Sequence, residues 1–416
     1  EIVIGRDSMK KRWRVAALGI CMAMLTCACS TQTEKADTSS TQQNGEKKET
    51  AEEKAEKAKQ AKLDLIDPAA YGNVDGLELE KGTYLSIIGK GSSETYWKTI
   101  KAGAEDAVAD LNKELGYEGS DKIKVVYSGP GKSDDVDEQV SILDEELDRY
   151  PAALAIAIVD SKSCEVQFDL ATMNGIPLIT FDSVGNYQGI MASVMTDNAK
   201  ASTEVATHMV ESLGDAGQVV VIAHDSKSLT SQERVNNFIA EIQNNHPNMS
   251  VAGPYYMDQI DDIKKTIAEQ QLDIVPVEGQ ELDEEQQTAL DDAIAQITDE
   301  DIYNYILEMN PDVKGIFATN GDTTMQALTA CEGKDMKDVV IMGYDADQEE
   351  IDAMKDGRIA GMIVQNPYGM GYATVVAEAR CALNMGNEAN VNTGYTWVTP
   401  DNIEDRTVQD ILYAEK

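Results

Sequence analysis

Apolar runs and amphipathic stretches alternate regularly along the chain after Gly82. Nine runs rich in β-branched residues are typical of buried strands, and they cover Tyr84–Gly89, Ile123–Ser128, Ala153–Val159, Pro177–Phe181, Gln218–Ala223, Val251–Tyr256, Lys314–Ala318, Val339–Gly343 and Ile359–Gln365. Helical patterns lie between most of them, for instance at Trp97–Leu115, Val136–Leu147, Val235–Asn244 and Tyr368–Leu383. Strands joined by helices predict parallel sheets covered on both faces. So many strands exceed one doubly wound sheet, so the pattern predicts two α/β lobes with ligands bound at the carboxyl ends of the strands.

One acidic segment interrupts this alternation. Residues 258–312 carry seventeen acidic and two basic residues, and they separate two strands by more than one helix requires. The pattern predicts a solvated helical insertion with helices near Asp283–Ala295 and Asp299–Met309. A calcium site is disfavoured because the segment contains no D-x-[DN]-x-[DN]-G loop.

The N-terminus has the pattern of an export signal. Four basic residues between Lys10 and Arg14 precede an apolar run of eleven residues, Val15–Leu25. A membrane span needs about 20 apolar residues, so this run fits a secretory signal better. The following Leu25-Thr26-Cys27-Ala28-Cys29 resembles the lipobox of bacterial lipoproteins, although Leu25 stands four places before Cys29 and not three. Residues 1–29 are therefore predicted to be a signal peptide with a lipobox, Cys29 suits lipidation better than Cys27, and simple secretion is the alternative.

The residues after this signal look like a spacer. Ser30 to about Lys62 contains Ser, Thr, Gln, Glu, Lys and Ala but no aromatic residue, which is typical of a solvated tether. We expect residues 30–78 to form a flexible acidic tether, with a fraying helix possible in Glu49–Lys62. Outside the signal only Cys164, Cys331 and Cys381 remain, and their wide spacing predicts buried free thiols rather than a disulfide framework.

Charge and missing motifs narrow the function classes. The 416 residues include 35 Lys+Arg and 74 Asp+Glu, a net charge of -39, which would repel a phosphate backbone and predicts no nucleic-acid partner. Cleavage before Cys29 would remove five basic and two acidic residues and leave the chain still more acidic. Gly131-Lys132-Ser133 lacks the first glycine of a phosphate-binding loop, and Gly89-Lys90-Gly91 lacks the third glycine of a dinucleotide loop. Without a catalytic or metal-ligand motif, we expect no enzyme, no cofactor and no metal site.

An ordered set of segments carries a family resemblance over roughly Gly82 to Val398. The segments are Ser93-Glu94-Thr95-Tyr96-Trp97, Ile176–Ser183, Thr196-Asp197-Asn198, Gln232–Phe238, Asn310–Asn320, Met342–Ala346 and Val364–Tyr368. In this order and spacing they resemble the type I periplasmic sugar-binding proteins of ABC transporters, the ribose/galactose-binding family. The resemblance implies two Rossmann-like lobes joined by three crossings near Asn198, Gln365 and Tyr395. The N-terminal lobe would comprise residues 79–197 plus 366–394, and the C-terminal lobe residues 198–365 plus 395–416.

The matched residues suggest a sugar site in the cleft between these lobes. The predicted ligand-binding residues are Glu94, Tyr96, Trp97, Asp182, Arg234, Asn320, Tyr344, Asp345 and Gln365. Aromatic rings can stack on the apolar faces of a sugar. Carboxylates accept bonds from its hydroxyls, and the arginine and amides donate to them.

Departures from the family pattern affect the predicted ligand. Ser183 stands where ribose binders have Arg, and Glu94 stands where they have Asn. Three candidate acids therefore face one arginine, which predicts a neutral or amine-bearing sugar or polyol rather than a sugar phosphate or sugar acid.

The resemblance implies an exported, lipid-anchored and monomeric solute-binding protein that delivers a monosaccharide or polyol to an ABC permease. Its membrane contact would be through the lipid only, at the cell surface or in the periplasm. A transcription regulator would need a helix-turn-helix where this chain has the signal and tether. A receptor for a sugar or autoinducer in chemotaxis or two-component signalling remains the alternative, because its fold and pocket would look alike.

Overall fold

The computed structural model describes residues 50–275 and 282–413. The predicted signal peptide with Cys29, and residues 30–49 of the predicted tether, lie outside this described part.

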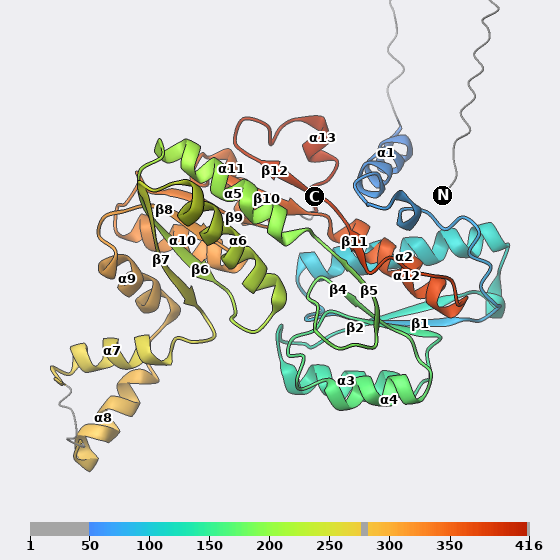
Figure 1. The fold of residues 1–416 in the computed structure, drawn as a ribbon, viewed down its shortest axis with the longest axis horizontal. Coiled ribbons are helices and arrows are strands. Elements are labelled where there is room, and N and C mark those ends of the chain that lie inside the picture. The colour runs from blue at the N-terminus through green and yellow to red at the C-terminus, as the bar shows by residue number, and fades with distance from the viewer. Residues whose placement is uncertain (1–49, 276–281, 414–416) are drawn as a thin grey trace, which may run out of the picture. The chain divides into compact units, whose positions relative to one another are not determined.

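The strands of the described chain form two six-stranded sheets. The first has the order β11-β5-β4-β3-β1-β2, all parallel. Its strands are β1 (Tyr84–Ile88), β2 (Lys124–Ser128), β3 (Ala153–Ile156), β4 (Leu178–Phe181), β5 (Ile190–Met195) and β11 (Asn390–Asn392). The second has the order β12-β10-β9-β8-β6-β7 and is parallel except for the β10–β12 pair. Its strands are β6 (Gly217–Ala223), β7 (Met249–Tyr256), β8 (Val313–Ala318), β9 (Val340–Tyr344), β10 (Gly361–Gln365) and β12 (Tyr395–Val398). We call the two sheets with their helices the N-terminal and C-terminal lobes (Figure 1).

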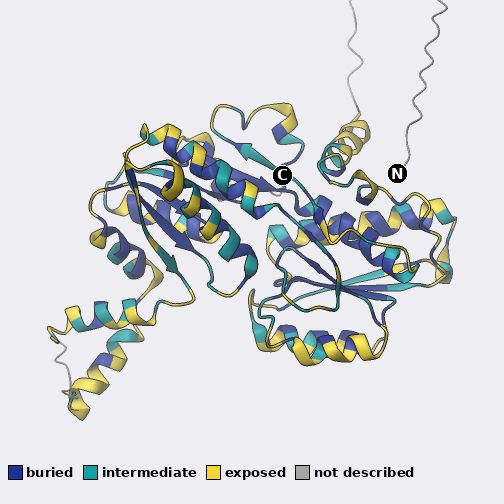
Figure 2. Cartoon of the chain, in the orientation of Figure 1, coloured by how far each residue is buried: buried dark blue, intermediate teal, exposed yellow. Residues whose placement is uncertain are grey.

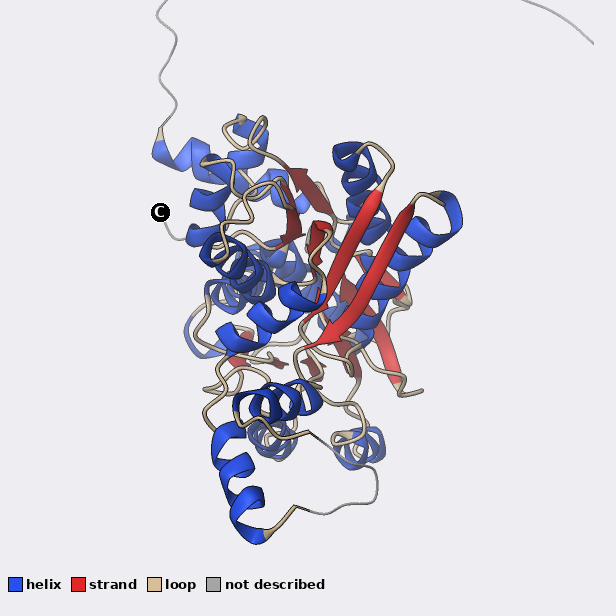
Figure 3. Cartoon of the chain, turned by 90° about the vertical axis from the view of Figure 1, so that its left-hand side faces the viewer, coloured by secondary structure: helices blue, strands red, loops and turns tan. Residues whose placement is uncertain are grey.

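Helices cover both faces of each sheet (Figures 1 and 3). In the N-terminal lobe, α2 (Thr95–Leu115) and α12 (Pro367–Ala382) contribute to one apolar cluster, and α3 (Val136–Leu147) and α4 (Glu165–Met173) to the other. In the C-terminal lobe, α5 (Asn198–Leu213) and α6 (Leu229–Asn245) cover one face. The opposite face carries α9 (Asp299–Met309), α10 (Gly321–Gly333) and α11 (Gln348–Lys355). Each sheet is therefore the centre of a three-layer sandwich, as its continuous apolar strands require.

The chain passes between the two sheets three times. It leaves β5 for α5 near Asn198, leaves β10 for α12 at Asn366, and leaves β11 for β12 at Thr393 and Gly394. The predicted fold class, two parallel α/β lobes with three crossings, is confirmed.

The predicted tether differs from the structure after residue 50. Helix α1 (Ala51–Leu63) begins at a capping box of Thr50 and Glu53, and the short helix η1 (Ala69–Tyr71) follows it. Six apolar side chains between residues 63 and 79 are buried in the core of the N-terminal lobe: Leu63, Ile66, Tyr71, Val74, Leu77 and Leu79. We call residues 62–79 the N-terminal strap. The prediction of a flexible tether through residue 78 is therefore wrong for the strap, because its apolar residues pack into the core of the N-terminal lobe.

The acidic segment is only partly an insertion. Its first helix, α7 (Asp261–Gln271), buries Ile267 and Ala268, and α8 (Glu284–Ile294) is mostly exposed (Figure 2). The third helix, α9, buries Ile302, Tyr303, Ile306 and Leu307 in the core of the C-terminal lobe. The predicted helices are present, but α9 is a covering layer of the second sheet and not part of a solvated excursion.

Two further sequence expectations can be compared with the described residues. Cys164, Cys331 and Cys381 are free and buried, as predicted. None of the helices in residues 50–275 and 282–413 is long and apolar enough to cross a membrane.

Candidate functional site

A cavity of about 520 Å³ lies where the carboxyl ends of strands from both sheets face one another. Eight of the nine predicted ligand-binding residues line it: Glu94, Tyr96, Trp97, Asp182, Arg234, Asn320, Asp345 and Gln365. Seven of these residues follow β1, β4, β6, β8 or β9 along the chain, and Gln365 is the last residue of β10. The convergence has a simple cause, because the carboxyl ends of parallel strands share one edge of each sheet.

The first turn of α2 supplies the aromatic part of the wall. Tyr96 and Trp97 meet edge to face with ring centroids 5.2 Å apart. The Tyr96 hydroxyl donates to Asp182 Oδ1 at 2.7 Å, and its ring lies 5.9 Å from that of Tyr413 in the C-terminal lobe. Burial raises the pKa of Tyr96 well above its usual value, with Asp182 adding to the effect, so the hydroxyl remains a donor. Glu94, just before α2, accepts a bond from Ser133.

Asp182 and Asp345 occupy matching places in the two lobes. Each directly follows a strand, β4 or β9, and each has a left-handed backbone, with φ of 55° and 80°. Asp tolerates this conformation better than most residues, and such backbones are common where a side chain is aimed at a ligand. Burial raises the pKa of Asp182, although Lys90, Tyr96 and Arg234 oppose the rise.

Arg234 is fixed from three directions. Its Nε donates to Asn198 Oδ1 at 2.8 Å, one terminal nitrogen donates to the carbonyl of Thr319 at 2.6 Å, and the other donates to Gln365 Oε1 at 3.0 Å. Gln365 in turn donates to Asp345 Oδ1 at 2.7 Å. The side chains of Arg234 and Gln365 are both nearly inaccessible, at 3% and 4% exposure. This network joins residues at the first and second crossings to the cavity.

Tyr344 is not a cavity residue. It is fully buried at the end of β9, its hydroxyl bonds with that of Ser202 at 2.8 Å, and the guanidinium of Arg234 lies 4.0 Å above its ring. The prediction that Tyr344 stacks on the ligand is therefore wrong. The Tyr344 side chain points to the helix-covered face of the sheet, and there its ring packs against the guanidinium of Arg234.

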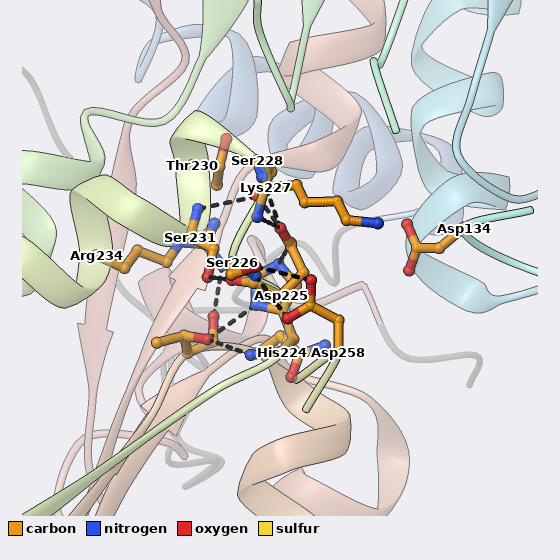
Figure 4. Close-up of polar contacts among 12 residues, drawn as sticks. Asp134, His224, Asp225, Ser226, Lys227, Ser228, Thr230, Ser231, Arg234 and Asp258 are labelled. Atoms are coloured by element: carbon orange, nitrogen blue, oxygen red, sulfur yellow. Dashed lines mark hydrogen bonds and ion pairs between the residues drawn. The ribbon is translucent and has the colours of Figure 1, made fainter. Parts of the chain in front are cut away.

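The loop between β6 and α6 is held by its own side chains (Figure 4). Asp225 accepts bonds from the backbone N–H groups of Lys227 and Ser228 at 2.7 and 2.6 Å, and from the Ser228 hydroxyl at 2.8 Å. Although burial disfavours its charge, the bond from His224 and the charges of His224 and Lys90 hold the pKa of Asp225 well below its usual range. The loop thus presents the first turns of α6 in a fixed position.

Thr230 in the first turn of α6 makes a direct contact between the lobes. Its hydroxyl donates to the backbone carbonyl of Asp182 at 2.9 Å. The next residue, Ser183, lines the cavity at 1% exposure, and its buried hydroxyl has no hydrogen-bond partner within the described chain. At this position, which the sequence resemblance aligns with an arginine of ribose binders, the Ser183 hydroxyl is thus unpaired in the described chain.

Several cavity residues were not predicted from the sequence. They include Lys90 and the acids Asp134, Asp322, Asp347 and Glu350, together with Tyr413. Lys90 is 7% exposed and pairs with Asp134 at 3.1 Å. Its place two residues after β1 could have indicated the cavity, as could the places of Asp322 and Asp347 shortly after β8 and β9. Nothing in the pattern indicates Tyr413, which reaches the cavity through the fold of the C-terminal segment.

The arrangement suits a small, hydrogen-bonding ligand. The cavity offers charged acceptors, a fixed guanidinium, amides of both polarities and aromatic edges, which is the mixture that orients a hydroxylated molecule. Its volume is within the range of small-molecule sites. Across the described residues, no three His, Cys, Asp or Glu side chains are grouped as metal ligands.

Comparisons with known proteins agree with this geometry. The periplasmic binding protein domain family matches residues 85–382. A ribose import binding protein of Bacillus subtilis (strain 168) is 22% identical over 237 residues, which are 57% of this chain and 65% of that protein, just under two thirds of its length. A xylitol-binding protein of Mycolicibacterium smegmatis is 22% identical over 337 residues, 78% of this chain and 84% of that protein.

Solved structures share the fold. An arabinose binding protein from Geobacillus stearothermophilus is 25% identical with a TM-score of 0.59, covering 78% of this chain and 98% of that one. An ABC transporter solute binding protein from Agrobacterium vitis, bound with alpha-D-tagatopyranose, is 21% identical with a TM-score of 0.64, covering 80% and 100%. With two parallel lobes, three crossings and a cleft lined from both sides, the chain belongs to the periplasmic binding protein family and has its type I fold, as its sequence motifs predicted.

Proposed function

We propose that this protein is an exported solute-binding protein that captures a monosaccharide or a related polyol between its lobes and delivers it to an ABC importer. The observation that carries the proposal is the convergence of Asp182 and Tyr96 from one lobe with Arg234, Asp345 and Gln365 from the other on a single cavity. A ligand bonded to both sets stabilises the closed arrangement of the lobes over any open one.

The names of the relatives support the same class of ligand. The Bacillus protein imports ribose by its name, the Mycolicibacterium protein binds xylitol, and the Geobacillus structure is an arabinose binding protein. Pentoses and polyols share the close spacing of hydroxyls that paired carboxylates and amides recognise. Lipid attachment through Cys29, action as a monomer and the permease partner belong to this proposal as well.

A thermal-shift panel on the chain from residue 30 tests the proposal directly. Ribose, arabinose, xylose, glucose, galactose, xylitol and sorbitol are each added at increasing concentration. Because a ligand that binds only the folded state stabilises it by mass action, at least one should raise Tm in a saturable manner. A panel that leaves Tm unchanged throughout would contradict the proposal.

A pair of matched substitutions then locates the site. Tyr96→Phe removes the hydroxyl that bonds to Asp182, and we expect about a tenfold or greater loss of affinity for the ligand found. Tyr372→Phe is the control, since that buried tyrosine donates to Asp110 at 3.0 Å and does not line the cavity. Isothermal titration calorimetry of both variants provides the measurement. Equal losses in the two variants would place the ligand elsewhere.

A further inference from the structure

We propose that the ligand carries a protonated amine, held by the carboxylates of the C-terminal lobe at the far wall of the cavity. This inference rests on the proposed function and names the substrate class more narrowly, as an amino sugar or amino polyol.

The charges that line the cavity are strongly unbalanced. Eight carboxylates do so: Glu94, Asp134, Asp182, Asp322, Asp345, Asp347, Glu349 and Glu350. The permanent cations among the lining residues are Lys90 and Arg234. His224 also lines the cavity, but its Nε2 is 2.9 Å from Asp225 Oδ2 and is already occupied by that acid. A neutral sugar would leave this excess of negative charge uncompensated in a partly dehydrated space.

Both cations influence Asp182, on the N-terminal side of the cavity. Lys90 pairs with Asp134 at 3.1 Å, and both Lys90 and Arg234 favour the charged form of Asp182. Within residues 50–275 and 282–413, by contrast, no lysine, arginine or histidine forms an ion pair with Asp322, Asp345, Asp347 or Glu350. We call these four the acidic wall. The uncompensated charge is thus concentrated on one side, where it would attract a single positive group.

Glu350 provides an independent observation that points to a cationic ligand at this wall. It lines the cavity at 2% exposure, and its Oε2 accepts the backbone N–H of Asp347 at 2.6 Å to cap α11. Its other oxygen, Oε1, is buried without a hydrogen-bond partner in the described chain. Capping needs one carboxylate oxygen, and a buried polar atom without a partner is rare in folded proteins. An ammonium group in the cavity would supply three donors and a charge for such acceptors.

The electrostatics of the wall agree with this reading. Burial, followed by the charge of Asp345, raises the pKa of Glu350 well above its usual range. The same two causes raise the pKa of Asp347 to about 6 and also raise that of Asp322. The wall therefore resists carrying its full negative charge when empty, and a bound cation relieves the repulsion among its members.

Matched ligands that differ only in the amine test the proposal. Calorimetry near neutral pH compares D-glucosamine with D-glucose, D-galactosamine with D-galactose, and 1-amino-1-deoxysorbitol with sorbitol. We expect the amine of at least one pair to bind about tenfold or more tightly than its neutral partner. The N-acetylated form of that amino sugar, which has no charge, should lose the advantage. Neutral partners that bind as tightly as the amines would overturn the inference.

Substitutions test whether the acidic wall causes the tighter binding of the amine. Glu350→Gln keeps an oxygen for the cap but removes the charge, and it should reduce the ratio of amine affinity to neutral-partner affinity about tenfold. Asp322→Asn, at an exposed position, is the second variant in case Glu350→Gln prevents the protein from folding. It should also reduce the preference for the amine. Asp352→Asn is the control, because this exposed acid lies on α11 outside the cavity. An unchanged amine preference in both wall variants would overturn the assignment.

The outcomes separate this inference from the function on which it rests. Tight binding of neutral sugars without an amine preference overturns the inference and leaves the proposed function standing. Binding of 1,4-diaminobutane without binding of any sugar or amino sugar supports a cation site and overturns the sugar-binding function. Failure of every compound to bind overturns both.

Discussion

Asp347 shows how a single carboxylate that lines the cavity makes the stability of the fold depend on pH. Its pKa of about 6 is higher than the value near 3.9 of an unfolded Asp, because of burial and the charges of Asp345, Asp322, Glu349 and Glu94. The folded chain therefore holds more protons than the unfolded chain between these values. This contribution to stability is complete below about pH 4 and is lost as the pH rises through about 6.

We therefore expect Asp347→Asn to stabilise the ligand-free protein in a pH-dependent way. The variant should gain about 1 kcal/mol over the wild type near neutral pH, a modest value because the Asp347 side chain is only partly shielded from water. The gain should disappear near pH 4, where both residues are neutral. Urea unfolding at the two pH values measures the difference, with Asp352→Asn as the control. A gain of equal size at both pH values would show that charge is not the cause.

The sequence predicts the position of a site residue where that residue lies at the end of a strand. Asp182, Asn320 and Gln365 lie at or just past strand ends, so the parallel pattern alone places them at one edge. Tyr344 also ends a strand but points to the covered face, and a sequence pattern does not show which face a terminal strand residue takes. Glu350 lies in a helix, and only the packing of α11 brings it to the cavity.

At the scale of elements, the pair α2 and α12 joins the site to the second crossing. Helix α2 carries Tyr96 in its first turn, and α12 begins two residues after Gln365. The two helices touch backbone to backbone, since a Cβ on Gly371 would lie 1.9 Å from the carbonyl oxygen of Ile100, and one on Gly103 would lie 2.0 Å from that of Tyr368. Neither contact leaves room for a methyl group.

We expect Gly371→Ala to destabilise the protein by roughly 1–3 kcal/mol, because the helices must separate to admit the side chain. Gly333→Ala is the matched control, since its Cβ would meet nothing within 4 Å at the end of α10. That change should be neutral or stabilise by up to about 1 kcal/mol through the unfolded state. Thermal unfolding of both variants measures the effects. An unchanged stability of Gly371→Ala would contradict the close contact between α2 and α12.

The sequence pattern identified elements where burial is complete and missed them where it is partial. All nine predicted strands are present, whereas β5, β11 and β12 were not predicted. Of these, β11 has three residues, and β5 and β12 alternate between buried and half-buried positions or lie at a sheet edge. The sequence pattern predicts a tether at the strap because the apolar residues there are separated by polar ones without a regular period.

At the scale of the whole described chain, the N-terminal strap contributes to stability as an element of the core. We compare a chain beginning at residue 62 with one beginning at residue 80. The second loses six buried apolar side chains, offset by the entropy of ordering the segment, and should be less stable by roughly 3–6 kcal/mol. Urea unfolding provides the measurement. Equal stability of the two chains would show that the strap covers the lobe without supporting it.

The strap also touches two of the three crossings. The Asn366 side chain donates to the carbonyls of both Lys62 and Thr393 at 2.8 Å, and Asp67 and Asn392 exchange backbone bonds of 2.8 and 2.9 Å. It also packs against the N-terminal lobe, for instance through Leu63 and Tyr71. If the N-terminal segment is anchored as we propose, the attachment would lie beside two of the crossings and on the N-terminal lobe, which carries α2. The C-terminal lobe, with the acidic wall, would then be the lobe that moves if a ligand closes the cleft as we propose.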